Sequence, residues 1–518
     1  MGKSYATTSN GDLSDTDLNS DEYLKAIQDL NHLQTNNQVL ALAKYKNPET
    51  ILPLFARQLR LAGIEPSKLN ELDIIHVSGT KGKGSTCALT ESILRASGLK
   101  TGFYNSPHLV KVTERIKING LPISEQVFSK YFRTIHDRLM KSCNANGDNM
   151  PSYFSFLTIL AFHIFLEERV DCAIMEVGIG GTYDPTNIIE KPIACGITTL
   201  DFDHTNILGN TLKSIAWSKA GIIKEGTCVF TVDHDQEEVL EVIRSRADAK
   251  SSRVFICKPI DAEAEGIELG IKGRVQQINA SVACHLARYF LIKTRPSIER
   301  SLPAISQPDD LIIEFSGPLT EAFRSGLEDC SWPGRCQIVH YPRIKFFLDG
   351  AHTKKSMQNC LEWYMQTTKN SESEAIRVLM LNVIGDRSKS EVLEPSTKYE
   401  DFDLVVFSTN RINSLGETPK SETFVNSKKV MPDNEKSLEN AKNNMTIWND
   451  LYERSFGATS KKPLIKLSAN VSDSLEVVIE RHRKLKPDDM HVLVAGSLHF
   501  VGAILETLPQ FSKRLEDL

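Results

Sequence analysis

The chain of 518 residues lacks several features that mark particular classes of protein. Its ten cysteines are scattered, without a C-x-x-C pair or a zinc-ligand spacing, which favours reduced thiols over disulfides. No apolar run approaches the ~18 residues that a membrane-spanning helix needs. A net charge of −5 gives no basic footprint for nucleic acid. We therefore expect a soluble cytoplasmic protein that binds neither nucleic acid nor a membrane.

The N-terminal segment also lacks the marks of a targeting sequence. Residues 1–22 are rich in Ser, Asp, Asn and Thr and contain no arginine. This composition predicts a disordered tail and is not typical of a mitochondrial presequence. A mitochondrial form made from another start site is still compatible with the sequence.

The remaining chain alternates strands with helices in two series, which predicts an α/β protein with parallel sheets covered on both faces. In the first series the expected strands and helices are strands 100–105, 171–177 and 195–200 and helices 124–139 and 153–168. In the second series they are strands 345–348, 378–381, 404–408 and 491–495 and helices 354–366 and 472–484.

Segments without clear periodicity suggest how the chain divides. Residues 294–334 contain several prolines and read as a domain junction, and the polar stretch 410–444 reads as a surface insertion. We predict an N-terminal domain at 23–310, a linker at 311–334 and a smaller C-terminal domain at 335–518. No internal repeat is visible.

The segment DIIHVSGTKGKGSTCALTESILRASG, residues 73–98, is the most informative part of the chain. An apolar strand runs into a glycine-rich turn, and a helix is expected from Ser85. Gly79, Gly82 and Gly84 let backbone N–H groups approach a phosphate, and the helix N-terminus adds positive charge. Lys83 is placed to reach the outer phosphates, while the hydroxyl of Ser85 or of the next residue could face Mg²⁺.

The loop is not a strict Walker A motif, because Gly84 separates Lys83 from Ser85. An ordinary strand–loop–helix turn with two exposed lysines is the alternative interpretation.

Polar residues also follow other expected strands, at the edge where α/β sheets bind ligands. Glu176 ends the apolar run CAIMEV and could hold Mg²⁺, which prefers oxygen ligands, although a solvated strand end is equally compatible. His204 lies in DFDHTNILGN with Asp201 and Asp203, but a single histidine is more often structural than a ligand. Ser106 alone would be a turn residue, and Lys219 an exposed lysine.

Three residues stand out in the second domain. Arg335 lies in SWPGRC, and Asp349 and His352 lie in FFLDGAHT, where a strand ends and a helix begins. The planar fork of arginine suits phosphate, so these groups could close over a nucleotide held by the first domain. Each is also compatible with an ordinary surface charge.

Together the segments resemble the folylpolyglutamate synthase family, within the group that contains dihydrofolate synthases and Mur peptide ligases. The resemblance runs from Tyr23 to Leu505, and the blocks that carry it are HVSGTKGKGSTCALTESILRASGLKTGFYNSPHLVKVTERIKINGLPIS, EVGIGGTYDPTNII, DHTNILGNT, WPGR and DGAHT. Lys81 in the loop is similar to the eukaryotic members, since bacterial bifunctional members tend to have Asn there.

The resemblance implies an N-terminal P-loop ATPase-like domain and a C-terminal Rossmann-like domain with ATP between them. It implies that the ATP-binding residues are Gly79, Thr80, Gly82, Lys83, Gly84, Ser85, Arg335 and Asp349. It implies Mg²⁺ sites at Ser106, Glu176 and His204, and a possible monovalent cation such as K⁺. Lys83, His204, Lys219 and His352 would form the catalytic group, with Lys219 matching a lysine that several relatives carry in carbamylated form.

The implied reaction adds L-glutamate to the γ-carboxylate of a folate, with ATP converted to ADP through an acyl phosphate. Two alternatives are a dihydrofolate synthase, which adds the first glutamate to dihydropteroate, and a nucleotide-binding protein that ligates nothing. Folate and glutamate are then the expected partners, and we expect a monomer. GRVQQINAS, residues 273–281, matches a family block near the end of the first domain.

Overall fold

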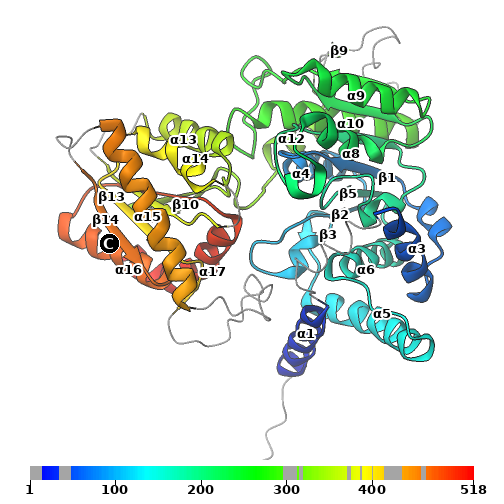
Figure 1. Ribbon diagram of the computed structural model, residues 1–518, viewed down its shortest axis with the longest axis horizontal. Coiled ribbons are helices and arrows are strands. Elements are labelled where there is room, and N and C mark those ends of the chain that lie inside the picture. The colour runs from blue at the N-terminus through cyan, green and yellow to red at the C-terminus, as the bar shows by residue number, and fades with distance from the viewer. Residues whose placement is uncertain are drawn as a thin grey trace, which may run out of the picture.

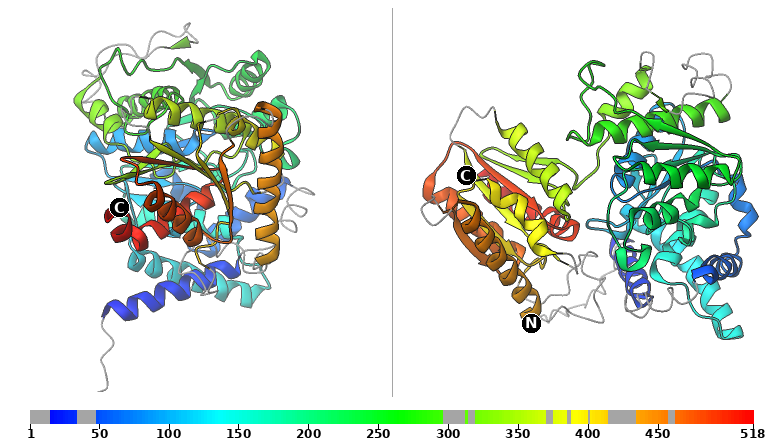
Figure 2. Two further views of the ribbon diagram at one scale, coloured as in Figure 1. Left: turned by 90° about the vertical axis from the view of Figure 1, so that its left-hand side faces the viewer. Right: turned by 45° about the horizontal axis from the view of Figure 1, so that its top comes forward.

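The computed structural model describes residues 15–33, 48–295, 312–313, 319–369, 375–384, 388–399, 401–413, 434–456 and 462–518. These residues form two bodies that lie side by side, each built around its own sheet (Figure 1). The first body runs from blue to green along the chain, and the second from yellow to red. Figure 2 shows both from two further directions.

Among the described residues, nine strands form the N-terminal sheet in the order β4-β3-β2-β5-β1-β6-β7-β8-β9. All neighbouring strands pair in parallel except β2 with β3 and β3 with β4. The strands are β1 Ile74–Ser78, β2 Thr101–Tyr104, β3 Ile116–Ile118, β4 Leu121–Pro122, β5 Cys172–Glu176, β6 Ala194–Ile197, β7 Cys228–Val232, β8 Arg253–Cys257 and β9 Ile312–Ile313. Because the central strand β1 is buried along its whole length, its sequence IIHVS is mostly apolar.

Helices cover both faces of this sheet. One core joins the sheet to α4 Lys83–Ala96, α10 Gln276–Thr294 and α12 Glu321–Glu328. A second core joins it to α1 Asp15–His32, α3 Ile51–Leu61, α5 Glu125–Asn146 and α6 Tyr153–Glu168. A third lies under α8 Leu212–Lys219 and α9 Glu237–Asp248, and the short α7 Thr205–Leu208 precedes them.

The C-terminal body contains a described six-stranded sheet in the order β10-β11-β15-β12-β13-β14. Only β10 pairs antiparallel in it. The strands are β10 Gln337–Tyr341, β11 Ile344–Leu348, β12 Ile376–Leu381, β13 Leu404–Ser408, β14 Leu464–Ser468 and β15 Met490–Ala495. The helices are α13 Lys354–Thr368, α14 Lys389–Leu393 and α15 Asn434–Phe456 over one face, and α16 Val471–Leu485 and α17 Leu498–Glu516 over the other.

The predicted fold class is confirmed: both bodies are α/β, with sheets that are mainly parallel. Each expected strand and helix of the two series is present, with ends that shift by a few residues. The largest extension is α5, which continues past residue 139 to Asn146 because Gly147 provides its left-handed end at φ 70°.

Three local expectations need correction. The loop helix begins at Lys83 rather than Ser85, because Gly82 is its N-cap. Helix α1 begins at Asp15, within the segment expected to be a disordered tail; residues 1–14 lie outside the described residues. The segment 294–334 is not devoid of regular structure, since β9 pairs with β8 and α12 packs against α4. Most of 410–444 lies outside the described residues.

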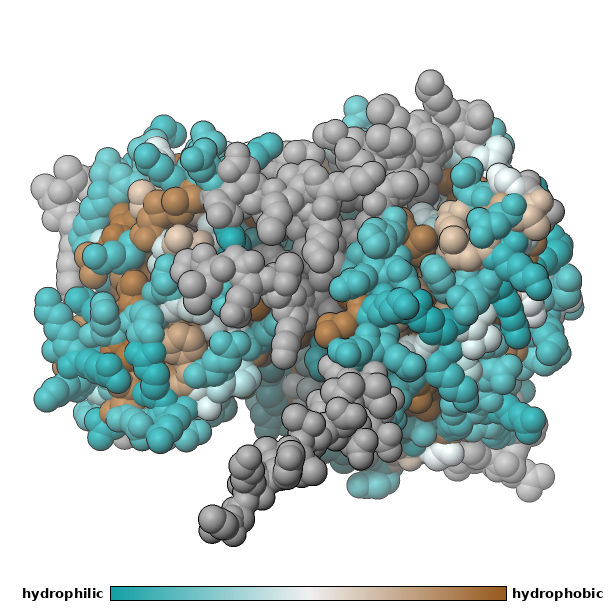
Figure 3. Space-filling view, turned by 90° about the horizontal axis from the view of Figure 1, so that it is seen from below, coloured by the Kyte–Doolittle hydropathy of each residue, from teal (hydrophilic) through white to brown (hydrophobic). Residues whose placement is uncertain are grey.

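The two bodies meet where α17 touches the loop that follows β2. A Cβ placed on Gly502 would lie 2.2 Å from the carbonyl oxygen of Leu109, so only glycine permits this approach. The face of the molecule in Figure 3 is largely hydrophilic, with apolar side chains in small patches. Among the described helices, none has the length and apolar character needed to cross a membrane.

Candidate active site at the junction of the two bodies

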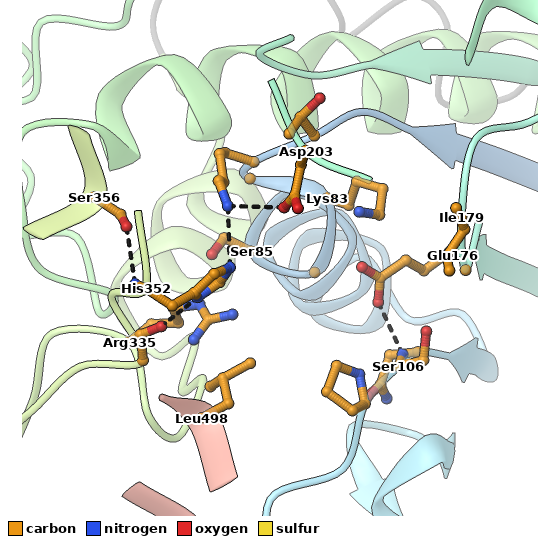
Figure 4. A pocket seen from close by; sticks show the side chains of 18 of the residues that line it. Lys83, Ser85, Ser106, Glu176, Ile179, Asp203, Arg335, His352, Ser356 and Leu498 are labelled. Carbon is orange, nitrogen blue, oxygen red and sulfur yellow. Dashed lines mark hydrogen bonds and ion pairs between the residues drawn. The ribbon is translucent and has the colours of Figure 1, made fainter. Parts of the chain in front are cut away.

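A cleft of ≈ 3310 Å³ lies between the two bodies and is lined by residues of both. It opens at the carboxyl ends of β1, β2 and β5 on one side and of β11, β12 and β15 on the other. The carboxyl ends of parallel strands are where open α/β sheets place their ligands. The cleft contains most of the residues that the sequence singled out. In Figure 4, Lys83, Ser85, Ser106 and Glu176 face Arg335, His352 and Leu498 across it.

The glycine-rich loop between β1 and α4 is shaped by its glycines. Gly79 and Gly82 have φ of 149° and 87°, which side chains rarely adopt. A Cβ would lie 1.9 Å from the Thr198 hydroxyl oxygen at Gly79, and 2.3 Å from the Asn279 amide oxygen at Gly82. Any larger residue would therefore deform the loop, which keeps its N–H groups at the start of α4 available to an anion.

Of the predicted loop residues, Thr80, Gly82, Lys83, Gly84 and Ser85 line the cleft. Gly79 is buried at the base of the loop and does not line the cleft. The Thr80 hydroxyl donates to the carbonyl of Asp201 at 3.1 Å, so it ties the loop to the segment after β6. Thr80 therefore positions the loop through its side chain.

Glu176 and Ser106 meet at the ends of β5 and β2. The Ser106 N–H donates to Oε2 of Glu176 at 3.0 Å. Burial raises the pKa of Glu176 above its ordinary value; the charge of Lys83, the Ser106 N–H and the charge of Arg335 oppose that rise. A buried carboxyl group thus lies in the same cleft as the glycine-rich loop.

His204 lies apart from this pair. It precedes α7 in a left-handed conformation, φ 51°, and is exposed where it lines the cleft. Among the described residues, no group of three His, Cys, Asp or Glu gathers into a cluster that could hold a metal. The structure thus joins Ser106 to Glu176 and leaves His204 on a separate loop of the same cleft.

Lys219 is buried and does not line the cleft. Its Nζ donates to the carbonyl of Gly79 at 2.7 Å, and its own carbonyl accepts from the Ser78 hydroxyl at 2.9 Å. Burial lowers the pKa of Lys219 well below its ordinary range, and the charge of Lys83 lowers it further. The expectation of an exposed lysine from the residue alone is wrong, because α8 ends directly under the glycine-rich loop.

On the opposite wall, Arg335 and Asp349 both line the cleft. Asp349 is buried, and its Oδ2 accepts the backbone N–H of Cys336 at 2.9 Å. Burial raises the pKa of Asp349, and the guanidinium of Arg335 opposes the rise. Asp349 therefore anchors the turn that presents Arg335.

A hydrogen-bonded chain crosses the cleft at Lys81. Its Nζ lies 3.2 Å from Oδ2 of Asp203 and 3.0 Å from Nε2 of His352 (Figure 4). An ammonium can only donate, so Nε2 of His352 is the acceptor. The ring proton is then on Nδ1, which donates to the carbonyl of Gly350 at 2.7 Å. Both ring nitrogens of His352 are thereby occupied.

Sequence reasoning gave no role to three residues that shape the site. Lys81 forms the chain just described, Asn279 packs against Gly82, and Trp332 lies 3.0 Å from a Cβ placed on Gly84. Asn279 lies within the GRVQQINAS block, which was a usable signal. Lys81 and Trp332 also lie in quoted motif blocks, but those blocks do not indicate their contacts, because the partners are distant in the sequence.

The comparisons with known proteins agree with this geometry. A mitochondrial folylpolyglutamate synthase of Bos taurus is 43% identical over 75% of this chain and 68% of its own length. The folylpolyglutamate synthase of Candida albicans is 37% identical over 94% of this chain and 96% of its own. The chain belongs to the folylpolyglutamate synthase family.

Solved structures extend the likeness to the fold. A folylpolyglutamate synthase of Mycobacterium tuberculosis complexed with ADP aligns over 94% of this chain and 98% of its own, with a TM-score of 0.68 and 22% identity. A folylpolyglutamate synthase complex with AMPPCP and folate aligns over 94% and 99%, with a TM-score of 0.63 and 23% identity. A scan against protein-family models found no match. The relatives thus confirm the family that the sequence motifs of this chain predict.

Proposed function

We propose that this protein is an ATP-dependent ligase that adds L-glutamate to the γ-carboxylate of reduced folates and forms ADP. Family membership supports the reaction class. The observation that carries the proposal in the structure is the shared cleft, where a glycine-built phosphate loop faces Arg335 and His352 of the second body.

ATP would be bound with its phosphates on the loop of Thr80, Gly82, Gly84 and Ser85. The N–H groups at the start of α4 and the charge of Lys83 suit a triphosphate. Arg335, presented by the turn that Asp349 anchors, would contact ATP from the other side. Gly79 contributes by letting the loop pack onto Thr198 rather than by touching the nucleotide.

The residues beside the loop fit Mg²⁺. Glu176 and Ser106 offer only oxygen side chains, and the described residues give Oε1 of Glu176 no hydrogen bond. Mg²⁺ would offset negative charge on the phosphates. His204 is proposed as a further ligand from its place on the cleft wall. The K⁺ site stays a prediction.

The chemistry requires activation of a carboxylate, which is a poor electrophile because its charge is delocalised. Transfer of the γ-phosphoryl group to the folate carboxylate gives an acyl phosphate and ADP. The α-amine of glutamate then attacks the acyl carbon, an amide forms, and phosphate leaves. Lys83 would offset charge on the transferring group, and the two walls would exclude water from the acyl phosphate.

Lys219 is proposed to be carbamylated. Its amine would attack CO₂, lose a proton to solvent and become an anionic carbamate whose remaining N–H can still donate to Gly79. The lowered pKa of Lys219, caused by burial, supports this because the neutral amine is the reactive form.

His352 is proposed to act as a positioning residue. Both of its ring nitrogens are engaged, so it holds Lys81 across the cleft instead of accepting a proton from substrate. The pair would help to keep the two walls together while the acyl phosphate exists.

Mass analysis of products tests the function. Purified protein is incubated with ATP, Mg²⁺, glutamate and either a reduced folate monoglutamate or dihydropteroate. We expect added glutamyl residues on the folate and ADP in equal amount to the new amide bonds. Product from dihydropteroate alone would instead identify a dihydrofolate synthase, and ATP hydrolysis without amide would identify a non-ligating protein.

The monomeric state, the cytoplasmic location and the domain boundaries at 310 and 335 stay predictions. Sedimentation of the purified protein and imaging of a tagged chain would test the first two.

A further inference from the structure

Arg115 is a buried cation on the wall of the cleft. It ends the short 3₁₀ helix Val112–Arg115, in the loop between β2 and β3, and is 5% exposed. It nevertheless lines the cleft. Arginine is rarely this buried unless an anion or hydrogen-bond acceptors pair with its charge.

The protein engages only part of the guanidinium. Nε donates to Nδ1 of His108 at 2.9 Å, and the guanidinium carbon lies 5.4 Å from the ring centroid of Tyr153. Within the described residues, no other hydrogen bond and no ion pair reaches the guanidinium of Arg115, and its terminal nitrogens are not sealed from the cleft. The two terminal NH₂ groups thus remain available on the cleft side.

The nearest acidic residues do not pair with this charge. Glu114, its neighbour in the chain, accepts the backbone N–H groups of Leu109, Val110 and Lys111 at 2.8, 3.1 and 2.8 Å. Glu176 binds the Ser106 N–H, and Arg115 is one of several more distant charges that act on it. A desolvated cation without a paired anion is costly, so a ligand anion would stabilise it.

The surroundings define the ligand. The ring of Tyr153 lies against Arg115, and Phe154, Ser106 and Glu176 line the same cleft. The guanidinium therefore offers two NH₂ groups to an anion, next to an aromatic ring and in the same cleft as the glycine-rich loop. A carboxylate attached next to an aroyl group matches it, since guanidinium and carboxylate pair in a bidentate manner.

We propose that Arg115 binds the α-carboxylate of the terminal glutamate of the folate substrate and thereby presents its γ-carboxylate for phosphorylation. This rests on the proposed function. A terminal glutamate has two chemically similar carboxylates, and the enzyme must activate one of them. Holding the α-carboxylate selects the other, and each round of elongation presents the same pair again.

The location favours the folate over the incoming glutamate as the owner of this carboxylate. Free glutamate has no ring to place against Tyr153 and Phe154. Arg115 also belongs to the N-terminal wall that holds Glu176 and the phosphate loop, where the acceptor carboxylate must meet ATP.

The experiment compares wild type, Arg115→Gln and Arg115→Lys on two substrates. One is tetrahydrofolate monoglutamate, and the other is its analogue with γ-aminobutyrate in place of glutamate, which keeps the reacting carboxylate and lacks the α-carboxylate. KM for each acceptor, for glutamate and for ATP is measured, with calorimetric binding of both acceptors in the presence of a nonhydrolysable ATP analogue.

We expect Arg115→Gln to raise KM and Kd for the monoglutamate at least about thirtyfold, as for other truncated buried charge pairs. The KM values of Arg115→Gln for glutamate and ATP should stay within about threefold of the wild-type values. Wild type and Arg115→Gln should bind the aminobutyrate analogue with similar Kd. Arg115→Lys keeps the charge without the fork and should lie between them. Arg138→Gln, which removes a bond to the Ala62 carbonyl away from the cleft, is the matched control and should leave every ratio unchanged.

Two results would overturn the assignment. If Arg115→Gln and Arg115→Lys raise the Kd of both acceptors equally, Arg115 has a structural role. A selective rise in KM for glutamate would place the incoming amino acid at Arg115. If wild type forms no amide from either acceptor, the proposed function is wrong, whereas calorimetry still decides whether Arg115 recognises the α-carboxylate.

Discussion

The two walls of the cleft are built by different means. The N-terminal wall presents backbone: Gly79 and Gly82 turn the chain, and the first N–H groups of α4 point at the site. The C-terminal wall presents side chains: Asp349 holds the backbone of the turn that carries Arg335, and His352 accepts a hydrogen bond from Lys81 of the other wall. The first wall is therefore sensitive to added bulk, and the second to loss of single partners.

This difference matters for ligation. A backbone cradle binds phosphate with little reorganisation, because its donors cannot rotate away. Contacts between side chains across a cleft can break and re-form, which would allow the second wall to open and close as substrates bind and products leave. The first wall therefore suits nucleotide binding, and the second suits closure.

The largest effect is expected at Lys83, the charged side chain of the backbone wall. Lys83→Ala should lower kcat by about 10²–10³-fold, because one stabilising charge at the transferring group is lost. Steady-state kinetics measure this, and a thermal melt shows that the variant is folded. Lys68→Ala, an exposed lysine outside the cleft, is the control. Near-normal ligation by folded Lys83→Ala would remove Lys83 from the mechanism.

Glu176→Gln should separate activity from stability. We expect kcat to fall about 10²-fold, since an anionic ligand is lost. The raised pKa of Glu176, caused by burial, means that the folded protein holds this proton more tightly than the unfolded chain does. Its contribution to stability is therefore present below the ordinary value of 4.5 and lost as pH rises through the raised pKa.

Urea unfolding without ligands checks the sign of that effect. The glutamine variant has no such proton to lose, so its stability relative to wild type should rise as the pH increases above 4.5, through the raised pKa of Glu176. A constant difference across this range would mean that burial does not perturb Glu176.

Gly82→Ala tests whether the backbone wall excludes bulk. The added Cβ would meet Asn279 at 2.3 Å in a left-handed residue, so we expect a loss of about 1–3 kcal/mol in unfolding free energy and weaker ATP binding. Gly98→Ala is the matched control, since Gly98 has φ +85° and no atom within 4 Å of its Cβ. Equal costs at both positions would assign the whole effect to backbone strain.

The smallest effect is expected at the bridge between the walls. Lys81→Met and His352→Gln, alone and together, form a double-mutant cycle whose coupling we expect at about 0.2–1 kcal/mol, because the lysine is partly exposed. The coupling is read from kcat/KM for ATP. A coupling of zero would show that Lys81 and His352 act separately.

Local sequence patterns were enough to predict much of the fold and several residues of the cleft. The strand–glycine–helix arrangement at 73–98 predicted the tight loop between β1 and α4, because glycines at positive φ are a local requirement of such a turn; that the loop binds phosphate stays a prediction. Polar residues after apolar runs likewise placed Glu176, Ser106 and Asp349 at the cleft. The start of α4 was misplaced because a left-handed glycine N-cap at Gly82 leaves no distinct sequence signal.

By itself, the sequence determined the elements, the α/β class and the family, since these follow from periodicity and from motifs whose residues are close along the chain. Only the tertiary structure decided that Lys219 is buried beneath Gly79, that Lys81 reaches His352 of the other body, and that Arg115 lines the cleft with Glu114 already engaged. Burial and pairing depend on neighbours that are far away in the chain, and no local pattern contains them.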